Sequence, residues 1–494
     1  MPTTERPGRL LAPVLLLVAA WFLYTSNLGP TTLVGDDEGM NLYPAWRAAM
    51  GERLYRDVAF DHTPVAIQLG ALLFRWTGPS ALAAKKMTVA FGLIGAFFAF
   101  LLAETFWGRN RALLALALLV SDSYWHFFSW FFTSDAYFLC FYVASVYMAA
   151  KAWQGGGRPL LWLTAGILGA VSVFAKLFGV FAFGGTFLFL LVVAVKPGND
   201  TSRRERALHG AGWMLTGAAA TTVLLLAPMM SYLDSFLALC VGHHRKSFQE
   251  LHPLWVYYAF FNVGWFSETP IAHRLLLFLG VLGLFRGIRD EATDGRVLLA
   301  CHLVQALAFL PAHLEFYARH LLFTLPFLAI FAAELLAALS AQRHDARRVA
   351  VGLGALAFAS ALFSFSSDLP RYERAAVVEF VRQATEPDDS ILAEHWEIPF
   401  LAGRRNTPLG EVPAGGGKPE KGIFRLEAAT IISAIEKDEP KLVLLLESPR
   451  KGEDCHFKGQ LANESGLRRH LESAYARVPT TSPDLADYSF FMRR

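Results

Sequence analysis

The sequence predicts an all-α polytopic membrane protein that carries a small α/β domain outside the membrane. Of the 494 residues, 54% are hydrophobic and 18% are charged, whereas about 25% of residues are charged in a typical soluble domain. Apolar runs that are long enough to cross a bilayer recur along the first three quarters of the chain. The residues from 367 onward, in contrast, are rich in charges, and short strand-like runs alternate there with helix-like runs.

The composition also excludes several other classes of protein. A disordered chain, a coiled coil and a small disulfide scaffold all need fewer apolar residues or more cysteines. The net charge of +3 gives no excess that would favour a nucleic-acid partner. The four cysteines lie far apart in the sequence, so they form neither a disulfide framework nor a C-x-x-C metal knuckle.

Eleven apolar runs are predicted to span the membrane. The first, near 10–25, follows Arg6 and Arg9, so a signal peptide is the competing interpretation. No small-residue cleavage site follows it, and Trp21 and Tyr24 are typical of an interfacial anchor, which favours a retained helix. The other ten runs lie near 82–104, 112–131, 136–152, 161–175, 177–195, 211–232, 271–286, 297–313, 320–340 and 349–366.

The placement of basic residues predicts the orientation of these spans. With the N-terminus in the cytoplasm, the short outer connections hold few basic residues, mainly Arg245, Lys246 and Arg319. The inner segments hold sixteen: Arg6, Arg9, Arg109, Arg111, Lys151, Arg158, Lys196, Arg203, Arg204, Arg206, Arg286, Arg289, Arg296, Arg343, Arg347 and Arg348. This asymmetry follows the positive-inside rule, and an odd number of spans puts the C-terminal part outside.

Two outer segments are too long to be turns. In the first outer loop, 28–81, residues 38–55 and 64–76 have helical patterns too short to span, so we expect helices at the membrane interface. The sequence thus divides into a transmembrane domain, 1–366, and an outer α/β domain, 367–494. In the latter, strands are expected at Lys441–Leu446 and Tyr488–Met492, and helices at 371–384 and 424–437.

Three consecutive carboxylates open the first outer loop: Asp36, Asp37 and Glu38. One interpretation is a solvated loop in which Asp36 or Asp37 caps the helix that follows. The functional interpretation is a general base or a metal-ligating carboxylate at the boundary between lipid and water.

Asp135 and Lys176 are charged residues beside apolar spans. Asp135 follows Phe131-Phe132-Thr133-Ser134, and an ionisable group at that depth is expected to be functional unless it only caps a helix. Asp122 is a similar acidic residue, but it lies in a more polar stretch of sequence. Lys176 interrupts the apolar run from Leu161 to Val195, so we expect it at the tip of a hairpin on the outer side. Its ammonium group either snorkels to the interface or faces a phosphate.

Further cationic groups are expected on the outer face. Arg319 and His320 form a pair that suits a phosphate, because arginine offers a bidentate fork. His62 precedes Pro64 and either donates to a phosphate or caps a helix. The loop 233–270 carries adjacent His243 and His244, whose spacing favours contact with lipid head groups over metal binding.

In this order, the residues resemble the GT-C membrane glycosyltransferases, especially the branch of protein O-mannosyltransferases and the lipid A aminoarabinose transferase. The resemblance covers about residues 10–340. It rests on Asp37-Glu38 after the first span, on a Gly51-to-Asp57 stretch with Tyr55, on His62-Thr63-Pro64, on Thr133-Ser134-Asp135-Ala136, on Lys176-Leu177-Phe178-Gly179 and on Arg319-His320-Leu321-Leu322-Phe323-Thr324-Leu325-Pro326. His62, Leu177 and His320 depart from the residues that are usual there, which are Lys, Gly and Tyr.

The resemblance implies a GT-C fold and an enzyme that transfers a hexose or pentose, with inversion, from a polyprenyl-phosphate-linked donor. The acceptor hydroxyl would belong to a glycolipid, a glycan or a protein, at the outer face of the cytoplasmic membrane. On this reading Asp37 is the base, and Glu38 and Asp135 support it or orient the acceptor. His62, Lys176 and Arg319 face the donor phosphate, and Asp36, Tyr55 and His320 complete the substrate site.

Two questions stay open at the level of sequence. A polytopic transporter or a flippase of lipid-linked sugars is the alternative function, although no internal repeat is present and the charged residues gather on one face. A divalent metal ion is compatible with the carboxylates and histidines, but no diagnostic ligand spacing identifies one.

Overall fold

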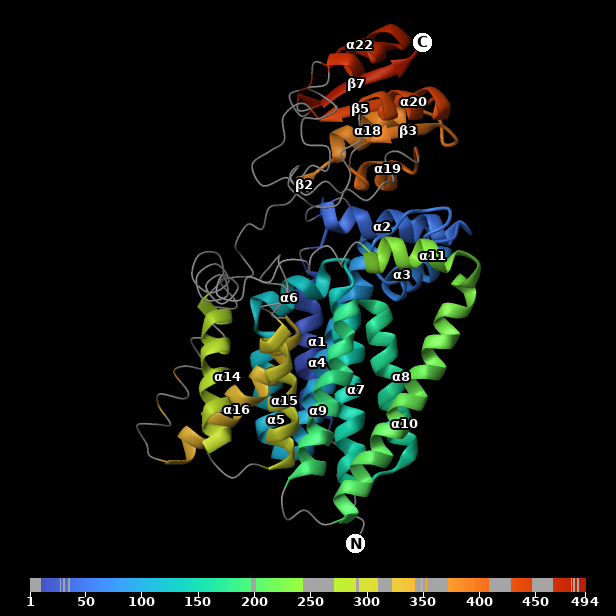
Figure 1. The fold of residues 1–494 in the computed structure, drawn as a ribbon. Coiled ribbons are helices and arrows are strands. Elements are labelled where there is room, and N and C mark those ends of the chain that lie inside the picture. Colours follow the sequence, from blue (N-terminus) through green and yellow to red (C-terminus); the bar gives the residue numbers. More distant parts are fainter. Residues whose placement is uncertain are drawn as a thin grey trace.

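The computed structural model describes residues 10–196, 201–242, 271–289, 293–309, 322–342, 372–407, 428–446 and 465–494, apart from a few positions within these ranges, together with the single residues 348 and 352. Its described part is a bundle of long helices with a layer of shorter helices and a small sheet beyond one end (Figure 1). We call the end of the bundle that carries these shorter helices and the sheet the loaded end.

The bundle consists of helices that follow most of the predicted spans. Its elements are α1 (Leu11–Thr25), α4 (Ala81–Trp107), α5 (Arg109–Val120), α6 (Ser123–Trp130), α7 (Asp135–Gln154), α8 (Pro159–Ala175), η1 (Leu177–Val180), α9 (Phe181–Val195), α10 (Thr201–Leu226), η2 (Ala227–Tyr232), α11 (Leu233–Phe236), η3 (Leu237–Gly242), α14 (Ile271–Arg289), α15 (Asp294–Phe309) and α16 (Leu325–Gln342).

The predicted number of eleven spans stays a prediction. Among the described residues, five helices are long and apolar enough to cross a membrane, or six if α5 and α6 form one bent span. Apart from Gly352, the predicted span at 349–366 lies outside the described residues. The predicted straight span at 112–131 is instead broken, with a bend of 66° between α5 and α6. The break occurs because the Asp122 side chain caps α6, accepting a hydrogen bond from the backbone N–H of Trp125 at 2.9 Å.

Close packing in the bundle depends on small residues, as is usual for helices in lipid. Where α8 crosses α10, a Cβ atom on Gly166 would lie 2.0 Å from the carbonyl oxygen of Met214. On the facing helix, a Cβ atom on Gly217 would lie 2.3 Å from the carbonyl oxygen of Leu163. Any larger residue at either position would therefore push the two helices apart.

The two helices expected in the first outer loop are present as α2 (Asp36–Ala49) and α3 (Val65–Thr77). They lie across the loaded end of the bundle, next to α11 (Figure 1). The short strand β1 (Thr32–Leu33) precedes α2 and pairs in antiparallel fashion with β2 (Tyr372–Glu373), at the start of the C-terminal part. We call the first turn of α2, which holds Asp36, Asp37 and Glu38, the acidic turn, and the strand that precedes it ties it to the C-terminal part by backbone pairing.

The C-terminal part is an α/β domain, as the sequence predicts. Its elements after β2 are α18 (Ala375–Ala384), β3 (Ser390–Ala393), α19 (Glu397–Ala402), β4 (Arg405–Asn406), α20 (Ala428–Asp438), β5 (Leu442–Leu446), α22 (Ser465–Ala474), β6 (Tyr475–Val478) and β7 (Tyr488–Arg493). Five strands form one sheet in the order β4-β3-β5-β7-β6. Strand β3 is parallel to β4 and β5, whereas β7 is antiparallel to β5 and β6.

This sheet has an apolar core on each face, because successive side chains of a strand point to opposite sides. On β7, Phe490 packs with residues of α18 and α19, and Phe491 packs with residues of α20 and α22. On β5, Leu444 and Val443 divide between the two faces in the same way. A continuous apolar run thus indicates a strand that is covered on both sides.

Candidate active site

The acidic residues after the first predicted span form the first turn of α2. Asp36 is its first residue, and its side chain lies outside the described part. The Asp37 side chain is partly exposed, and its backbone carbonyl accepts a hydrogen bond from the Asn41 amide at 2.6 Å. Glu38, in contrast, is fully buried. The helix N-terminus favours these negative charges, and of the two described side chains only that of Asp37 can receive a ligand from solvent.

Glu38 forms a buried ion pair with Lys85 of α4. The carboxylate oxygen Oε2 lies 3.3 Å from the Lys85 Nζ, and Oε1 accepts a hydrogen bond from the backbone N–H of Phe132 at 3.2 Å. Lys85 is also fully buried and lies over the Trp130 ring at 5.0 Å. These contacts join α2 to α4 and to the segment that leads into α7, so they hold the first turn of α2 on the bundle.

Asp135 and Lys176 meet at the same end of the bundle. Asp135 begins α7, and its Oδ1 lies 2.5 Å from the Nζ of Lys176, which sits between α8 and η1 as the hairpin prediction places it. The hydroxyl of Thr133 donates to the other carboxylate oxygen at 3.0 Å. The Lys176 side chain is 13% exposed, whereas that of Asp135 is 2% exposed. The pair thus joins the start of α7 to the turn between α8 and η1, and the lysine is its more exposed member.

Tyr55 and His62 lie together in the connection between α2 and α3. The Tyr55 hydroxyl donates to the His62 carbonyl at 2.6 Å, and the His62 Nδ1 lies 2.6 Å from the Oδ1 of Asp61. Burial raises the pKa of Tyr55 well above its ordinary value, and the nearby Cys240 and Asp61 raise it further. Tyr55 therefore stays protonated and keeps donating. The His62 side chain is 34% exposed, so its ring is accessible to a ligand.

A further ionisable pair is Asp122 with His273 of α14. The Asp122 Oδ2 lies 2.8 Å from the His273 Nδ1, and both side chains are fully buried. The His273 ring stacks on Tyr124 with centroids 4.4 Å apart. Asp122 thus both ends α5 and holds α14 against α6, which is a structural role.

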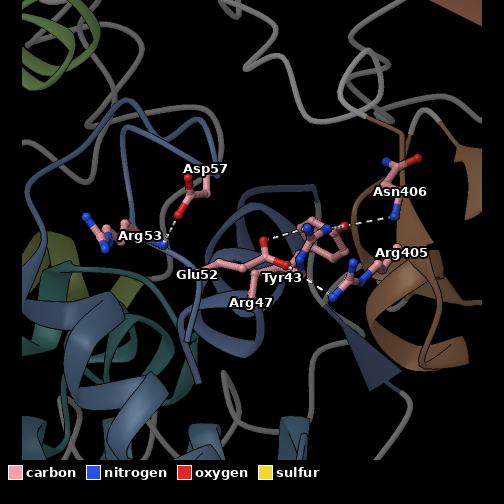
Figure 2. A network of polar contacts seen from close by, with 7 residues as sticks. All are labelled: Tyr43, Arg47, Glu52, Arg53, Asp57, Arg405 and Asn406. Carbon is pink, nitrogen blue, oxygen red and sulfur yellow. Dashed lines mark hydrogen bonds and ion pairs between the residues drawn. The ribbon is translucent and has the colours of Figure 1, made fainter. Parts of the chain in front are cut away.

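A polar network joins the first outer loop to the C-terminal domain (Figure 2). The Tyr43 hydroxyl accepts hydrogen bonds from the Arg47 guanidinium and from the backbone N–H of Asn406, the latter at 2.8 Å. Arg47 forms an ion pair with Glu52 at 2.5 Å, and Glu52 lies 3.5 Å from Arg405. Residues more than 350 positions apart are therefore held together at this junction.

Three of these partners were not among the residues that the sequence singled out. Lys85 stands at the start of a span beside Lys86, and sequence does not tell which of the two is buried. Asp61 adjoins His62 in Asp61-His62-Thr63-Pro64, which is a local signal for the contact. His273 pairs with Asp122 across about 150 positions, and no short-range pattern indicates such a contact.

The described residues test other expectations only in part. Arg319, His320, His243 and His244 lie outside the described residues. Within the described part, no group of three or more His, Cys, Asp or Glu side chains is arranged to hold a metal ion.

Comparison with known proteins gives one family-model match. Residues 61–224 match the model of dolichyl-phosphate-mannose-protein mannosyltransferases, and this segment contains Asp135 and Lys176. No curated protein sequence matches the chain.

Solved structures share the fold at low sequence identity. ArnT from Cupriavidus metallidurans, bound to undecaprenyl phosphate, superposes with a TM-score of 0.70 and 13% identity, over 99% of this chain and 98% of that one. Its apo form gives 0.68 and 14%, over 97% of both chains. The oligosaccharyltransferase AglB from Archaeoglobus fulgidus, in complex with an inhibitory peptide and a dolichol-phosphate, gives 0.58 and 13%, over 100% of this chain and 75% of that one. The chain thus shares the fold of ArnT and AglB, and its residues 61–224 resemble the dolichyl-phosphate-mannose-protein mannosyltransferases.

Proposed function

We propose that the protein transfers a hexose or pentose from a polyprenyl-phosphate-linked donor to an acceptor hydroxyl of a glycolipid, glycan or protein. The observation that carries this proposal is the Asp135–Lys176 pair. Both residues belong to the segment that matches the mannosyltransferase model, and they meet at 2.5 Å at the loaded end of the bundle. There a carboxylate and a partly exposed cation lie beside apolar helices.

The donor class is supported by chemistry and by two relatives. A polyprenyl chain partitions into the bilayer, which keeps the attached phosphate at the interface. Lys176 then stabilises the phosphate as it leaves, with His62, Arg319 and His320 as further cationic or donor groups. ArnT was solved with undecaprenyl phosphate and AglB with a dolichol-phosphate, which are both lipid phosphates of this kind.

In the transfer step, we assign the role of general base to Asp37. The acceptor oxygen attacks the anomeric carbon, the bond from that carbon to the phosphate oxygen breaks, and the acceptor proton passes to the Asp37 carboxylate. The polyprenyl phosphate leaves with the electron pair of the broken bond, and the anomeric configuration inverts. Asp37 suits this task because it is partly exposed, whereas Glu38 is buried with Lys85. Asp135 orients the reactants with Asp36 and Tyr55.

The proposed location is the cytoplasmic membrane, with the N-terminus in the cytoplasm. Residues 1–366 would form the transmembrane catalytic domain and 367–494 a periplasmic domain. The gathering of the candidate residues at one end of the bundle supports a site on the outer side, because the sixteen basic residues mark the inner side. A divalent ion stays a prediction of the sequence, and transfer before and after dialysis against a chelator tests it.

The proposal is tested by sugar transfer in proteoliposomes. Radiolabelled polyprenyl-phosphate hexoses and pentoses serve as donors, and a membrane glycolipid and glycan extract serves as the acceptor. Asp37→Asn is expected to lower transfer about 10³-fold, within the range for loss of a general base. The matched control is Asp388→Asn, a change at an exposed carboxylate of the C-terminal domain.

Two outcomes would overturn the proposal. Wild-type transfer by a well-expressed Asp37→Asn variant would remove the base assignment. Movement of the intact lipid-linked sugar across the bilayer, without cleavage of the bond between sugar and phosphate, would instead support the flippase alternative.

A further inference from the structure

The C-terminal domain packs against α2 only one residue after Glu38. A Cβ atom on Gly39 would lie 2.7 Å from the backbone nitrogen of Glu397 and 2.7 Å from its Oε2. Contacts this short do not occur, so only glycine allows α19 to approach α2 so closely. Glu397 is 2% exposed and lies 3.4 Å from both Arg374 and His395. Glu397 of the C-terminal domain is therefore held in place and buried where it contacts the acidic turn.

Aromatic packing extends this contact along the same face of α2. Tyr43 and Trp46 follow Gly39 by four and seven positions, which places all three on one side of a helix. The Tyr43 ring packs edge-on against Trp396 at 5.8 Å, and the Trp46 ring packs against Phe400 at 6.3 Å. One face of α2 thus packs against α19. Another face contacts the bundle through the ion pair of Glu38 with Lys85.

Polar contacts lie at both ends of this junction between α2 and the C-terminal domain. At one end, β1 pairs with β2 just before the acidic turn, and Arg374 directly follows β2. At the other end, the Tyr43 hydroxyl accepts from Asn406, and Glu52 faces Arg405 (Figure 2). We call the contacts of Gly39, Tyr43 and Glu52 with the C-terminal domain the α2 clamp.

We propose that the α2 clamp makes the C-terminal domain a positioning element of the catalytic site, with Gly39, Tyr43 and Arg405 as positioning residues for Asp37. This inference rests on the proposed function of Asp37. A helix gripped on two faces has a fixed tilt and rotation, so the position of its first turn relative to Asp135 and Lys176 is fixed as well. A misplacement of about 1 Å can cost roughly 10²-fold in rate, which makes such a grip matter for turnover.

The test compares three clamp variants in the proteoliposome assay, with the donor that gives the fastest transfer. Gly39→Ala inserts a methyl group against Glu397 and is expected to lower kcat about 10²-fold, with the donor KM changed less than about threefold. Tyr43→Phe removes one hydroxyl without changing the packing volume, and about a tenfold loss is expected. Arg405→Glu is expected to lower kcat, and Arg405→Lys to retain it, because the pairing charge is kept.

Matched controls stand outside the clamp. Gly212→Ala adds a methyl group in α10 at a point where no described atom outside that helix's own backbone lies within 4 Å, and Arg493→Glu reverses a charge in the exposed pair with Glu439. Both are expected to retain wild-type kcat. Hydrogen–deuterium exchange of residues 36–49 provides a readout that is independent of transfer. We expect at least severalfold faster exchange there in the clamp variants and no change in the controls.

The outcomes separate the two proposals. If wild-type protein transfers no sugar, the proposed function fails, and faster exchange in α2 still shows that the clamp orders this helix. If wild-type protein is active, and Gly39→Ala and Tyr43→Phe keep the kcat of Gly212→Ala, the positioning role is overturned. If Gly39→Ala does not fold, the comparison of Tyr43→Phe with the two Arg405 variants decides in the same way.

Discussion

Two carboxylate–lysine pairs at the loaded end of the bundle use the same chemistry in different surroundings. The Glu38–Lys85 pair is fully buried, its atoms are 3.3 Å apart, and it also binds a backbone N–H and an indole ring. The Asp135–Lys176 pair is closer, at 2.5 Å, and its lysine is 13% exposed. Both carboxylates are buried, so burial of the lysine, rather than residue type, separates the pair that holds helices together from the pair that can meet a ligand.

The difference predicts how each pair responds when one partner is lost. A buried pair that loses a partner leaves an uncompensated charge, so the cost falls on folding. Where only the lysine is partly exposed, its removal opens space through which water can reach the buried carboxylate, so the cost falls mainly on the reaction instead. The following variants test this division.

The largest expected effect on stability is that of Lys85→Met. It leaves the Glu38 carboxylate buried without its cation, which costs about 3–5 kcal/mol of the free energy of unfolding. Thermal unfolding in detergent measures this loss. Lys86→Met is the matched control, because the neighbouring Lys86 is exposed. The structural role of the Glu38–Lys85 pair is wrong if the two variants unfold at the same temperature.

Lys176→Ala is expected to lower transfer about 10²-fold to 10³-fold, as loss of one stabilising donor does in other active sites. The unfolding temperature should fall less than that of Lys85→Met, because removal of the partly exposed lysine side chain opens space through which water can reach the buried Asp135 carboxylate. Lys151→Ala, at an exposed lysine near the end of α7, is the control and should transfer normally. A loss of stability as large as that of Lys85→Met would show that the two pairs are equivalent.

Tyr55→Phe is expected to have the smallest effect. It removes the hydrogen bond to the His62 carbonyl, which costs about 1 kcal/mol of stability. The folded-state pKa of Tyr55 is raised by burial, so the hydroxyl stays protonated through its ordinary value of 10.0. Because the raised pKa favours the protonated form, its contribution to stability decreases only as pH rises above that ordinary value. Unfolding measured from neutral to alkaline pH should therefore show the difference between wild type and Tyr55→Phe narrowing only at the alkaline end.

Local patterns predicted much of this arrangement. The apolar runs indicated most of the bundle helices, and Lys176 lies between α8 and η1 because a single charge interrupts a run of two spans. The patterns of 441–446 and 488–492 indicated β5 and β7, which are apolar on both faces. The two helices of the first outer loop were also predicted, with ends that differ by a few residues.

Long-range pairing could not be predicted in the same way. The partner of Glu38 depends on which side of α4 faces inward, and Lys85 and Lys86 look alike in sequence. The bend at Asp122 depends on a capping hydrogen bond that competes with a continuous apolar run. The contact of Gly39 with Glu397 joins segments that no local pattern connects. The candidate site is thus predictable as a set of residues, whereas its supporting contacts require the three-dimensional structure.

The antiparallel pairing of β1 with β2 has a consequence for how the chain is made. Its two short strands are about 340 positions apart, so the pairing closes a very long loop, and such contacts form late in folding. During synthesis the helices of the bundle emerge first, and the segment before the acidic turn has no strand to pair with until residue 373 has left the ribosome. The candidate site is therefore completed only after about three quarters of these residues have been made, and chains released before residue 373 carry the acidic turn without its partner strand.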